Sequence, residues 1–153
     1  MIYAVKVDVD SKNPVLAQKN VPDNLDMMKA ELFSPELEVN KASIGDNEYT
    51  IVSDAQPFLS NKVNISAFIP APNIEDSGIF FGSLIICKGS EGSFSSLDVE
   101  EIDQISKNTI VMRTESGAMA PCVIFGAPFK NTRSRDKAVQ ALNDFIDFFN
   151  SQV

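Results

Sequence analysis

The stretch GIFFGSLIICKGSEGSFSSLDVEEI, residues 78–102, decides how this chain is expected to fold. Its first part, IFFGSLIICK (79–88), is apolar at nearly every position, so it predicts a strand with both faces buried at the centre of a sheet. Gly82 interrupts the run and indicates a bulge or the close approach of another segment. The last part has the composition of a helix start, so a strand, a glycine-containing turn and a helix follow one another.

A strand, a glycine loop and a helix in this order can hold a phosphate, but the residues here argue against it. Neither phosphate-binding pattern, G-x-x-x-x-G-K-[ST] or G-x-G-x-x-G, occurs in KGSEGSFSSLD. The helix start carries Asp98, Glu100, Glu101 and Asp103, which occupy the positive end of the helix dipole. Asp98 instead fits an N-cap with Glu101 as its capping-box partner. The same four carboxylates are a candidate partner-facing surface that mimics nucleic-acid charge, with a solvated helix face as the alternative.

The remaining segments predict a mixture of strands and helices around this centre. The expected elements are a strand at 2–9, a helix at 22–33, a hairpin of 36–44 and 48–52, a strand or an extended loop at 62–70, a hairpin of 109–113 and 121–126, and a helix at 134–149. The first strand should turn Tyr3, Val5, Val7 and Val9 toward the core. Together they predict one α+β domain over residues 1–153, with an antiparallel or mixed sheet packed by two or three helices.

Composition excludes several classes of function. The chain of 153 residues has a formal net charge of -8, which disfavours nonspecific binding to nucleic acid. No apolar run approaches the roughly 18 residues of a membrane span, and the N-terminus lacks the pattern of a signal peptide. We therefore expect a cytoplasmic protein that does not act in a membrane.

The residue types also limit catalysis. The absence of histidine removes Ser-His-Asp and Cys-His chemistry and the usual imidazole ligands of zinc. Cys87 and Cys122 lie in apolar segments, which predicts buried free thiols. The segment DVDSKN (8–13) begins like a calcium loop but has lysine and asparagine where that loop needs Asp or Asn and then glycine. We therefore predict no catalytic residue, no metal site and no cofactor.

One segment has the composition of an anion site. All three arginines of the chain and nearby basic and hydroxyl residues make up the candidate set, Arg113, Lys130, Thr132, Arg133, Ser134, Arg135 and Lys137. Most of them stand where the last helix begins, and free backbone N–H groups together with guanidinium groups favour phosphate or carboxylate. The alternatives are a solvated loop whose charges balance an acidic protein, and a docking surface for an acidic patch.

Three short motifs carry a resemblance to a known family. They are Asn64 with Ala67, the strand Gly82-Ser83-Leu84-Ile85-Ile86, and the helix start Ser96-Leu97-Asp98-Val99-Glu100-Glu101-Ile102. In this order they resemble an uncharacterised family of small proteins encoded by phages and mobile elements, mostly of Gram-positive bacteria. The resemblance covers roughly residues 1–105, so the hairpin and helix over 109–153 are then a family-specific extension. It implies a small accessory protein acting in an infected or element-bearing host.

These observations lead to three hypotheses about function. The first is a non-enzymatic accessory binding protein of the phage or mobile-element type whose partner is a host protein. The second is a sponge-like binder of a small phosphorylated or nucleotide-like ligand, held near Arg133, Arg135 and Lys137. The third is an enzyme that depends on carboxylates or a metal. An unpaired edge strand also leaves a homo-oligomer open.

Overall fold

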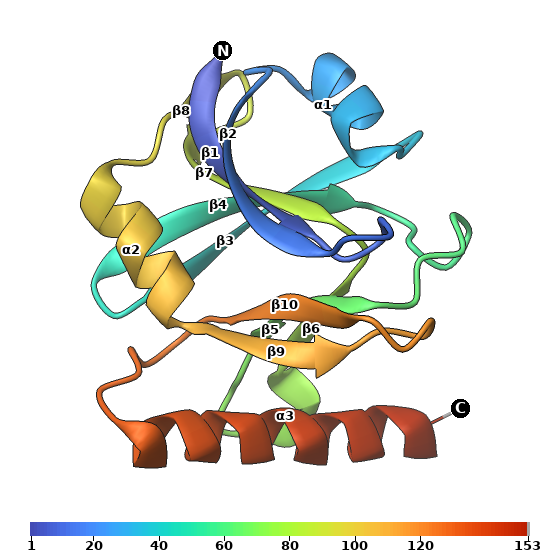
Figure 1. Ribbon diagram of the computed structural model, residues 1–153, viewed down its shortest axis with the longest axis vertical. Helices are drawn as coiled ribbons and strands as arrows, with labels where there is room; N and C mark the ends of the chain where they lie inside the picture. The colour runs from blue at the N-terminus through green and yellow to red at the C-terminus, as the bar shows by residue number, and fades with distance from the viewer. Residues whose placement is uncertain (153) are drawn as a thin grey trace.

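Two β-sheets lie face to face in the computed structural model, which describes residues 1–152 (Figure 1). Helix α1 (Leu25–Leu32) covers the outer face of the larger sheet, and α3 (Thr132–Ser151) covers the outer face of the smaller one. Helix α2 (Val99–Lys107) packs at one side of the space between the sheets. The predicted class, a single compact α+β domain, is confirmed, and its strands are divided between two sheets.

The larger sheet is antiparallel throughout and holds six strands. Its order is β2 (Val15–Val21), β1 (Ile2–Asp8), β7 (Leu84–Ser90), β4 (Asn47–Asp54) and β3 (Leu37–Ile44), with β8 (Ser93–Ser95) paired to β7 alone. The predicted first hairpin is confirmed as β3 and β4, whose turn includes Gly45 at a φ of +59°. Strand β2 was not predicted.

The smaller sheet holds four strands and is mixed. Its order is β6 (Gly78–Phe81), β5 (Ile65–Ile69), β10 (Met119–Ile124) and β9 (Thr109–Arg113). The pair β5 and β10 is parallel, and β9 with β10 forms the second predicted hairpin. The segment at 62–70, which the sequence left between strand and loop, therefore contains a strand. A short 3-10 helix, η1 (Ile74–Asp76), connects β5 to β6.

The stretch 79–88 is two strands rather than one, and they belong to different sheets. Its first half is β6, at the edge of the smaller sheet, and its second half is β7, between β1 and β4. Gly82 separates them with a φ of +85°, and a Cβ atom there would lie 2.6 Å from Cδ of Lys62. The single strand was a wrong prediction, because a lysine far away in sequence crosses the chain at this point. The prediction that the LIIC residues lie in a central strand is confirmed.

Strand β1 is buried on both faces, which alternation alone did not indicate. Val5 and Val7 face the space between the sheets, while Ile2 and Ala4 face α1. Tyr3 is 38% exposed, so its predicted place in the core was wrong. Figure 1 shows that β1 begins at the end of the larger sheet that lies far from the smaller sheet, so the first residues of β1 are not packed between the two sheets.

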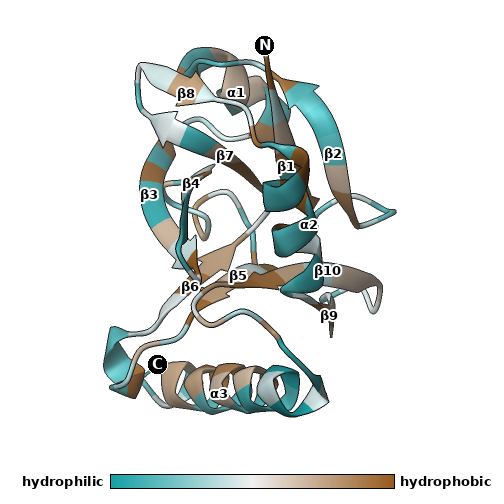
Figure 2. Cartoon of the chain, turned by 90° about the vertical axis from the view of Figure 1, so that its left-hand side faces the viewer, coloured by the Kyte–Doolittle hydropathy of each residue, from teal (hydrophilic) through white to brown (hydrophobic). Residues whose placement is uncertain are grey.

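Three apolar clusters hold the layers together, and Figure 2 shows the hydrophobic residues of β5 and β10 in brown between the layers. Cys87 lies in the cluster under α1, and Cys122 lies in the cluster under α3. Both are buried free thiols, as predicted, and they lie in different layers of the fold. Burial raises the pKa of each thiol to about 12, so neither is a reactive nucleophile at neutral pH.

Each of the three α-helices begins with a side-chain cap. Asn24 caps α1, and Asp98 with Glu101 forms the predicted capping box of α2. At the start of α3, Asn131 is the N-cap and Ser134 is its partner in a second capping box. No helix within residues 1–152 is long and apolar enough to cross a membrane.

Candidate functional site: a polar cleft with an apolar rim

A cleft of about 410 Å³ lies at the end of the sandwich where several loops meet, on the right in Figure 1. Its walls come from the end of β1, the C-terminal end of α1, the loop after β4 and the start of β7. A larger hollow of about 640 Å³ lies beside the start of α1, lined by exposed groups such as Asp23, Asp26 and Glu91. We take the smaller cleft as the candidate site because buried polar side chains build it.

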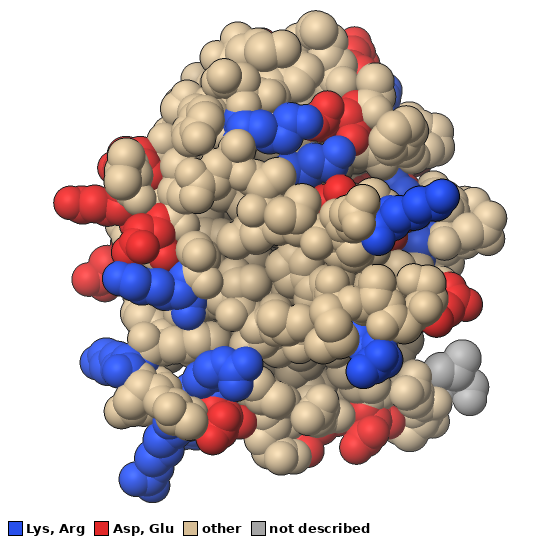
Figure 3. All heavy atoms as spheres, viewed as in Figure 1, with Lys and Arg blue, Asp and Glu red and all other residues tan. Residues whose placement is uncertain are grey.

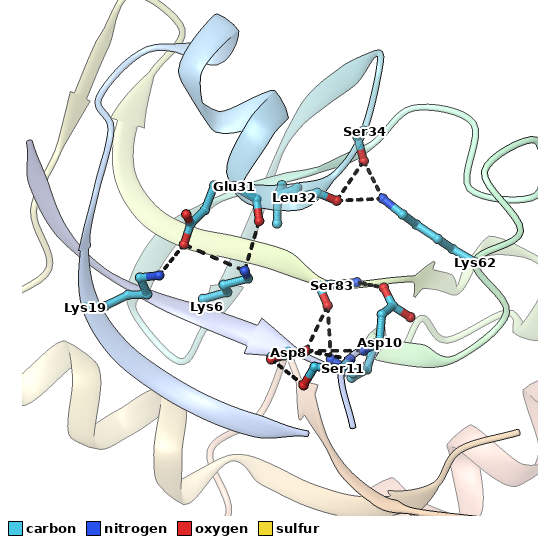
Figure 4. Close-up of polar contacts among 11 residues, drawn as sticks. Lys6, Asp8, Asp10, Ser11, Lys19, Glu31, Leu32, Ser34, Lys62 and Ser83 are labelled. Atoms are coloured by element: carbon cyan, nitrogen blue, oxygen red, sulfur yellow. Dashed lines mark hydrogen bonds and ion pairs between the residues drawn. The ribbon is translucent and has the colours of Figure 1, made fainter. Parts of the chain in front are cut away.

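Lys62 forms the floor of the cleft and is almost fully buried (Figure 4). Its Nζ atom lies 3.0 Å from Oδ2 of Asp54 and donates to the carbonyl oxygen of Leu32 at 2.9 Å and to the hydroxyl of Ser34. An ammonium group has three donors, and here each has an acceptor. Lys62 therefore fastens the end of α1 to β4, and it has no donor left for a ligand.

Asp54 is the buried acceptor of this network. Burial alone raises the pKa of its carboxyl group, but hydrogen bonds from Lys62, the backbone N–H of Gln56 and Ser34 outweigh that effect, so the pKa lies below its usual value. The hydroxyl of Ser34 donates to Asp54 at 2.8 Å, and Ser34 is only 5% exposed. Ser34 beside Lys62 has the residue types of a Ser-Lys nucleophile pair, but this geometry makes it part of the floor.

A second wall is an ion triad on β1, β2 and α1. The carboxylate of Glu31 pairs with Lys19 and lies 3.7 Å from Nζ of Lys6, which also donates to the backbone carbonyl of Glu31 at 2.9 Å. Burial raises the pKa of Glu31, but the hydrogen bond from Lys19 and the charges of Lys6 and Lys19 outweigh it, so the pKa is lowered. The triad is therefore charged at neutral pH, and because two lysines share one carboxylate it keeps one net positive charge.

Another wall is the segment DVDSKN (8–13), which begins like a calcium loop. Oδ1 of Asp8 accepts the N–H groups of Asp10 and Ser11, and Oδ2 accepts the Ser11 hydroxyl at 2.8 Å. Oδ2 of Asp10 accepts the N–H of Ser83 at 2.8 Å. These bonds close a local turn against β7. Within residues 1–152 no three acidic or cysteine side chains stand close enough together to hold a metal ion.

Large exposed apolar side chains lie at the cleft and in the turn beside it. We call them the rim: Phe33 is 84% exposed, Phe58 55%, Leu59 79% and Val63 44%. Phe33 and Val63 line the cleft directly, and Phe58 and Leu59 stand in the turn just before it. Phe33 ends α1 with a φ of +51°, a left-handed conformation in which glycine is the usual residue. The fold gains little from an aromatic residue at this position.

A second hollow of about 390 Å³ continues from the cleft toward β9 and shares Val63, Asn64 and Glu115 with it. Asn64 holds the junction, since its amide donates to the carbonyl of Val9 at 3.3 Å and accepts the N–H of Glu115 at 2.9 Å. The Asn64 carbonyl also accepts the N–H of Gly82 at 2.8 Å. Three segments are thus fixed around one residue, two of them by its side chain and one by its backbone carbonyl.

The predicted anion residues are only partly brought together. Those at the start of α3 gather at the lower left in Figure 3, where Lys and Arg are blue; they are Lys130, Thr132, Arg133, Ser134, Arg135 and Lys137. Arg113 ends β9 on the other side of Figure 1 and donates to the carbonyl of Gly117 at 3.1 Å. The helix start also holds its own cap, since Asn131 accepts the N–H of Ser134 at 2.9 Å.

The predicted partner-facing carboxylates lie together on the first turns of α2, but three of them have internal partners. Glu101 belongs to the capping box and lies 2.7 Å from Nζ of Lys88. Asp103 pairs with Lys107 at 2.8 Å. Asp98 is the N-cap, so Glu100 is the one carboxylate of the four without such a contact within residues 1–152.

The sequence did not indicate the cleft, because its residues come from segments that look ordinary one at a time. The one local signal is Phe33 followed by Ser34-Pro35, a helix end without glycine. Comparison of the chain with protein-family models, with curated proteins and with solved structures finds no match in any of the three.

Proposed function

We propose that this protein is a non-enzymatic accessory binding protein that holds a partner protein against the rim. The observation that carries the proposal is the rim itself, four large apolar side chains that are each at least 44% exposed at one end of the fold. Exposed apolar patches with a polar surround mark interaction surfaces, and the energy of such surfaces comes mostly from a few aromatic and apolar anchors. Phe33 has the features of such an anchor.

The rim also rests on a stable base, which favours binding. Phe33 follows α1, whose last turn is fastened by Lys62, and Phe58 packs on Phe81 with ring centroids 4.9 Å apart. Side chains that are already placed lose little conformational freedom when a partner binds. In the setting implied by the resemblance to phage and mobile-element proteins, the partner is a protein of the host cytoplasm.

The chemistry of the cleft supports binding over turnover. The donors of Lys62 are all in use and Ser34 is buried, and the two thiols lie outside the cleft with a pKa of about 12. The carboxylate of Glu31 is neutralised by two lysines. None of these groups is placed to transfer a proton to a bound molecule or to attack one.

Site-specific photo-crosslinking tests the proposal. A benzophenone amino acid replaces Leu59, and in a control it replaces Val99, which is similarly exposed at 82% but lies on α2. In a lysate of the cells that carry the gene, we expect one adduct from position 59 and none from position 99. Excess unlabelled wild type should displace the adduct, and a Phe33→Ser variant should displace it poorly. Equal labelling from both positions, or equal displacement by both competitors, contradicts the proposal.

A further inference from the structure

We propose that the cleft receives a basic side chain, lysine or arginine, from an extended segment of the partner whose neighbouring apolar residues cover the rim. This inference rests on the proposed function and adds the chemistry of the segment that is recognised. Its basis is that the lysines of the cleft have ion-pair partners within the fold, whereas several of its carboxylates have none.

Both ammonium groups of the cleft have an acidic partner within the fold. Lys62 is bonded to Asp54 and to two further acceptors, and Lys6 is bonded to Glu31. The carboxylate of Glu31 is matched by two lysines. Three lysines thus face two carboxylates, Glu31 and Asp54, so one positive charge is left over at this side of the cleft.

Three further carboxylates line the cleft, and within residues 1–152 none of them has an ion-pair partner: Asp8, Asp10 and Glu115. The oxygens of Asp8 accept bonds from neutral donors, which stabilise its position without cancelling its charge. Asp10 uses only Oδ2, for the N–H of Ser83, and within residues 1–152 the Glu115 side chain accepts no hydrogen bond. These three negative charges exceed the one positive charge left over at Glu31, so the cleft carries a local negative charge with free acceptors.

These free acceptors stand where a side chain could enter. Asp10 follows β1 and Glu115 follows β9, and Asn64 lies between them through its bonds to Val9 and Glu115. An ammonium or guanidinium group placed there would form charge-assisted hydrogen bonds with both carboxylates, which are stronger than bonds between neutral groups. Phe33 at the mouth adds an aromatic face that attracts a cation.

The apolar residues of the segment would lie against the second hollow. The second hollow begins at Val63 and Asn64 and is lined farther on by the apolar side chains of Ile65 and Met112. Successive side chains of an extended segment alternate in direction, and every second one lies about 7 Å farther along. A basic residue in the cleft would therefore place an apolar residue two positions away near Met112. A free polyamine shares the charge but gains nothing from the exposed rim, so we commit to a protein segment.

Selection from a random peptide library displayed against the full-length protein tests this inference. We expect the enriched peptides to contain arginine or lysine beside apolar residues. Replacing that arginine with citrulline, or that lysine with norleucine, removes the charge and should weaken binding by about tenfold or more. Fluorescence anisotropy with labelled peptides measures the change.

Matched protein variants provide the second measurement. Asp10→Asn with Glu115→Gln removes two charges but keeps an oxygen that accepts the Ser83 N–H, and it should weaken the peptides by about tenfold. The control, Glu38→Gln with Glu100→Gln, removes two exposed charges elsewhere and should change nothing.

Several results overturn the inference, and they can be told apart from failure of the proposed function. No enriched peptide, enriched peptides without basic residues, no effect of the uncharged replacement, or equal effects of both variant pairs each reject it. Spermidine that binds as tightly as the peptides also rejects it, in favour of a small cation. If peptides need Phe33 and Leu59 but ignore the carboxylates, the proposed function stands and this inference fails. If they ignore Phe33 and Leu59 as well, the proposed surface is wrong.

Discussion

Replacing Phe33 with glycine should leave the protein at least as stable as the wild type, although an aromatic residue is lost. A side chain in the left-handed region is strained by about 1–2 kcal/mol, and glycine removes that strain. Glycine also gives the unfolded chain more freedom, which lowers stability by about 0.4–1 kcal/mol. The ring is 84% exposed, so losing its remaining contacts removes only about 0.4 kcal/mol.

The comparison with alanine isolates the backbone term. Phe33→Ala loses the same ring contacts but keeps the strain, so it should be less stable than the wild type by about 0.4 kcal/mol. Phe33→Gly should exceed Phe33→Ala by about 0.8 kcal/mol, or about 2–3 °C in Tm. Both variants should lose partner binding to the same extent, because both lack the ring.

Urea unfolding followed by circular dichroism measures these differences, since the chain has no tryptophan to report by fluorescence. The slopes must agree among the three proteins, so that the midpoints report stability alone. An alanine variant as stable as the glycine variant would refute the assignment of strain to Phe33. A glycine variant that binds the partner as well as the wild type would refute its role as an anchor.

Three further predictions concern the buried groups. Lys62→Met keeps a long aliphatic chain over Gly82 but leaves Asp54 buried without its cation, so we expect a loss of about 3–5 kcal/mol in urea unfolding; a loss under about 1 kcal/mol contradicts the ion-pair assignment. The pKa of Asp54 is lowered in the folded state from a usual value of 3.8, so its contribution to stability is present above that value and is lost as the pH falls through the lowered folded pKa. Thermal unfolding across the acid range should show this loss of stability in the wild type and a smaller loss in Asp54→Asn. Equal slopes of stability against pH in the two proteins count against this prediction. Iodoacetamide at mildly alkaline pH should leave Cys87 and Cys122 unmodified in the native protein and label both in urea, as mass spectrometry would show; fast labelling of either one in the native state contradicts its burial.

Much of the fold could be predicted because its signals are local. The hairpin turn at Gly45, the capping box of Asp98 with Glu101 and the apolar stripe of the last helix each lie within a few residues, so sequence spacing alone reports them. Strand β2, VLAQKNV, gave no such signal. It is an edge strand in which apolar and polar residues do not alternate, and it is set by pairing with β1 rather than by its own pattern.

The features that sequence reasoning missed depend on contacts between distant residues. The break at Gly82 follows from Lys62, twenty positions earlier, and the cleft joins walls from segments that are spread along the chain between Lys6 and Glu115. The basic residues at the start of α3 were grouped correctly because they are neighbours in sequence, whereas the place of Arg113 depends on the direction of β9. Local chemistry predicts elements, but the gathering of polar groups in a cleft is a property of the tertiary structure.

The crossing at Gly82 has a consequence for the order in which the chain can fold. The chain builds most of the larger sheet, moves to the smaller sheet for β5 and β6, returns for β7 and β8, and finishes the smaller sheet with β9 and β10. Neither sheet is therefore complete until late in synthesis, and β5 waits for β10, its parallel neighbour, which emerges more than fifty residues later. Such nonlocal pairing slows folding and keeps apolar surface exposed on the ribosome, where a nascent chain is most open to chaperones and to aggregation.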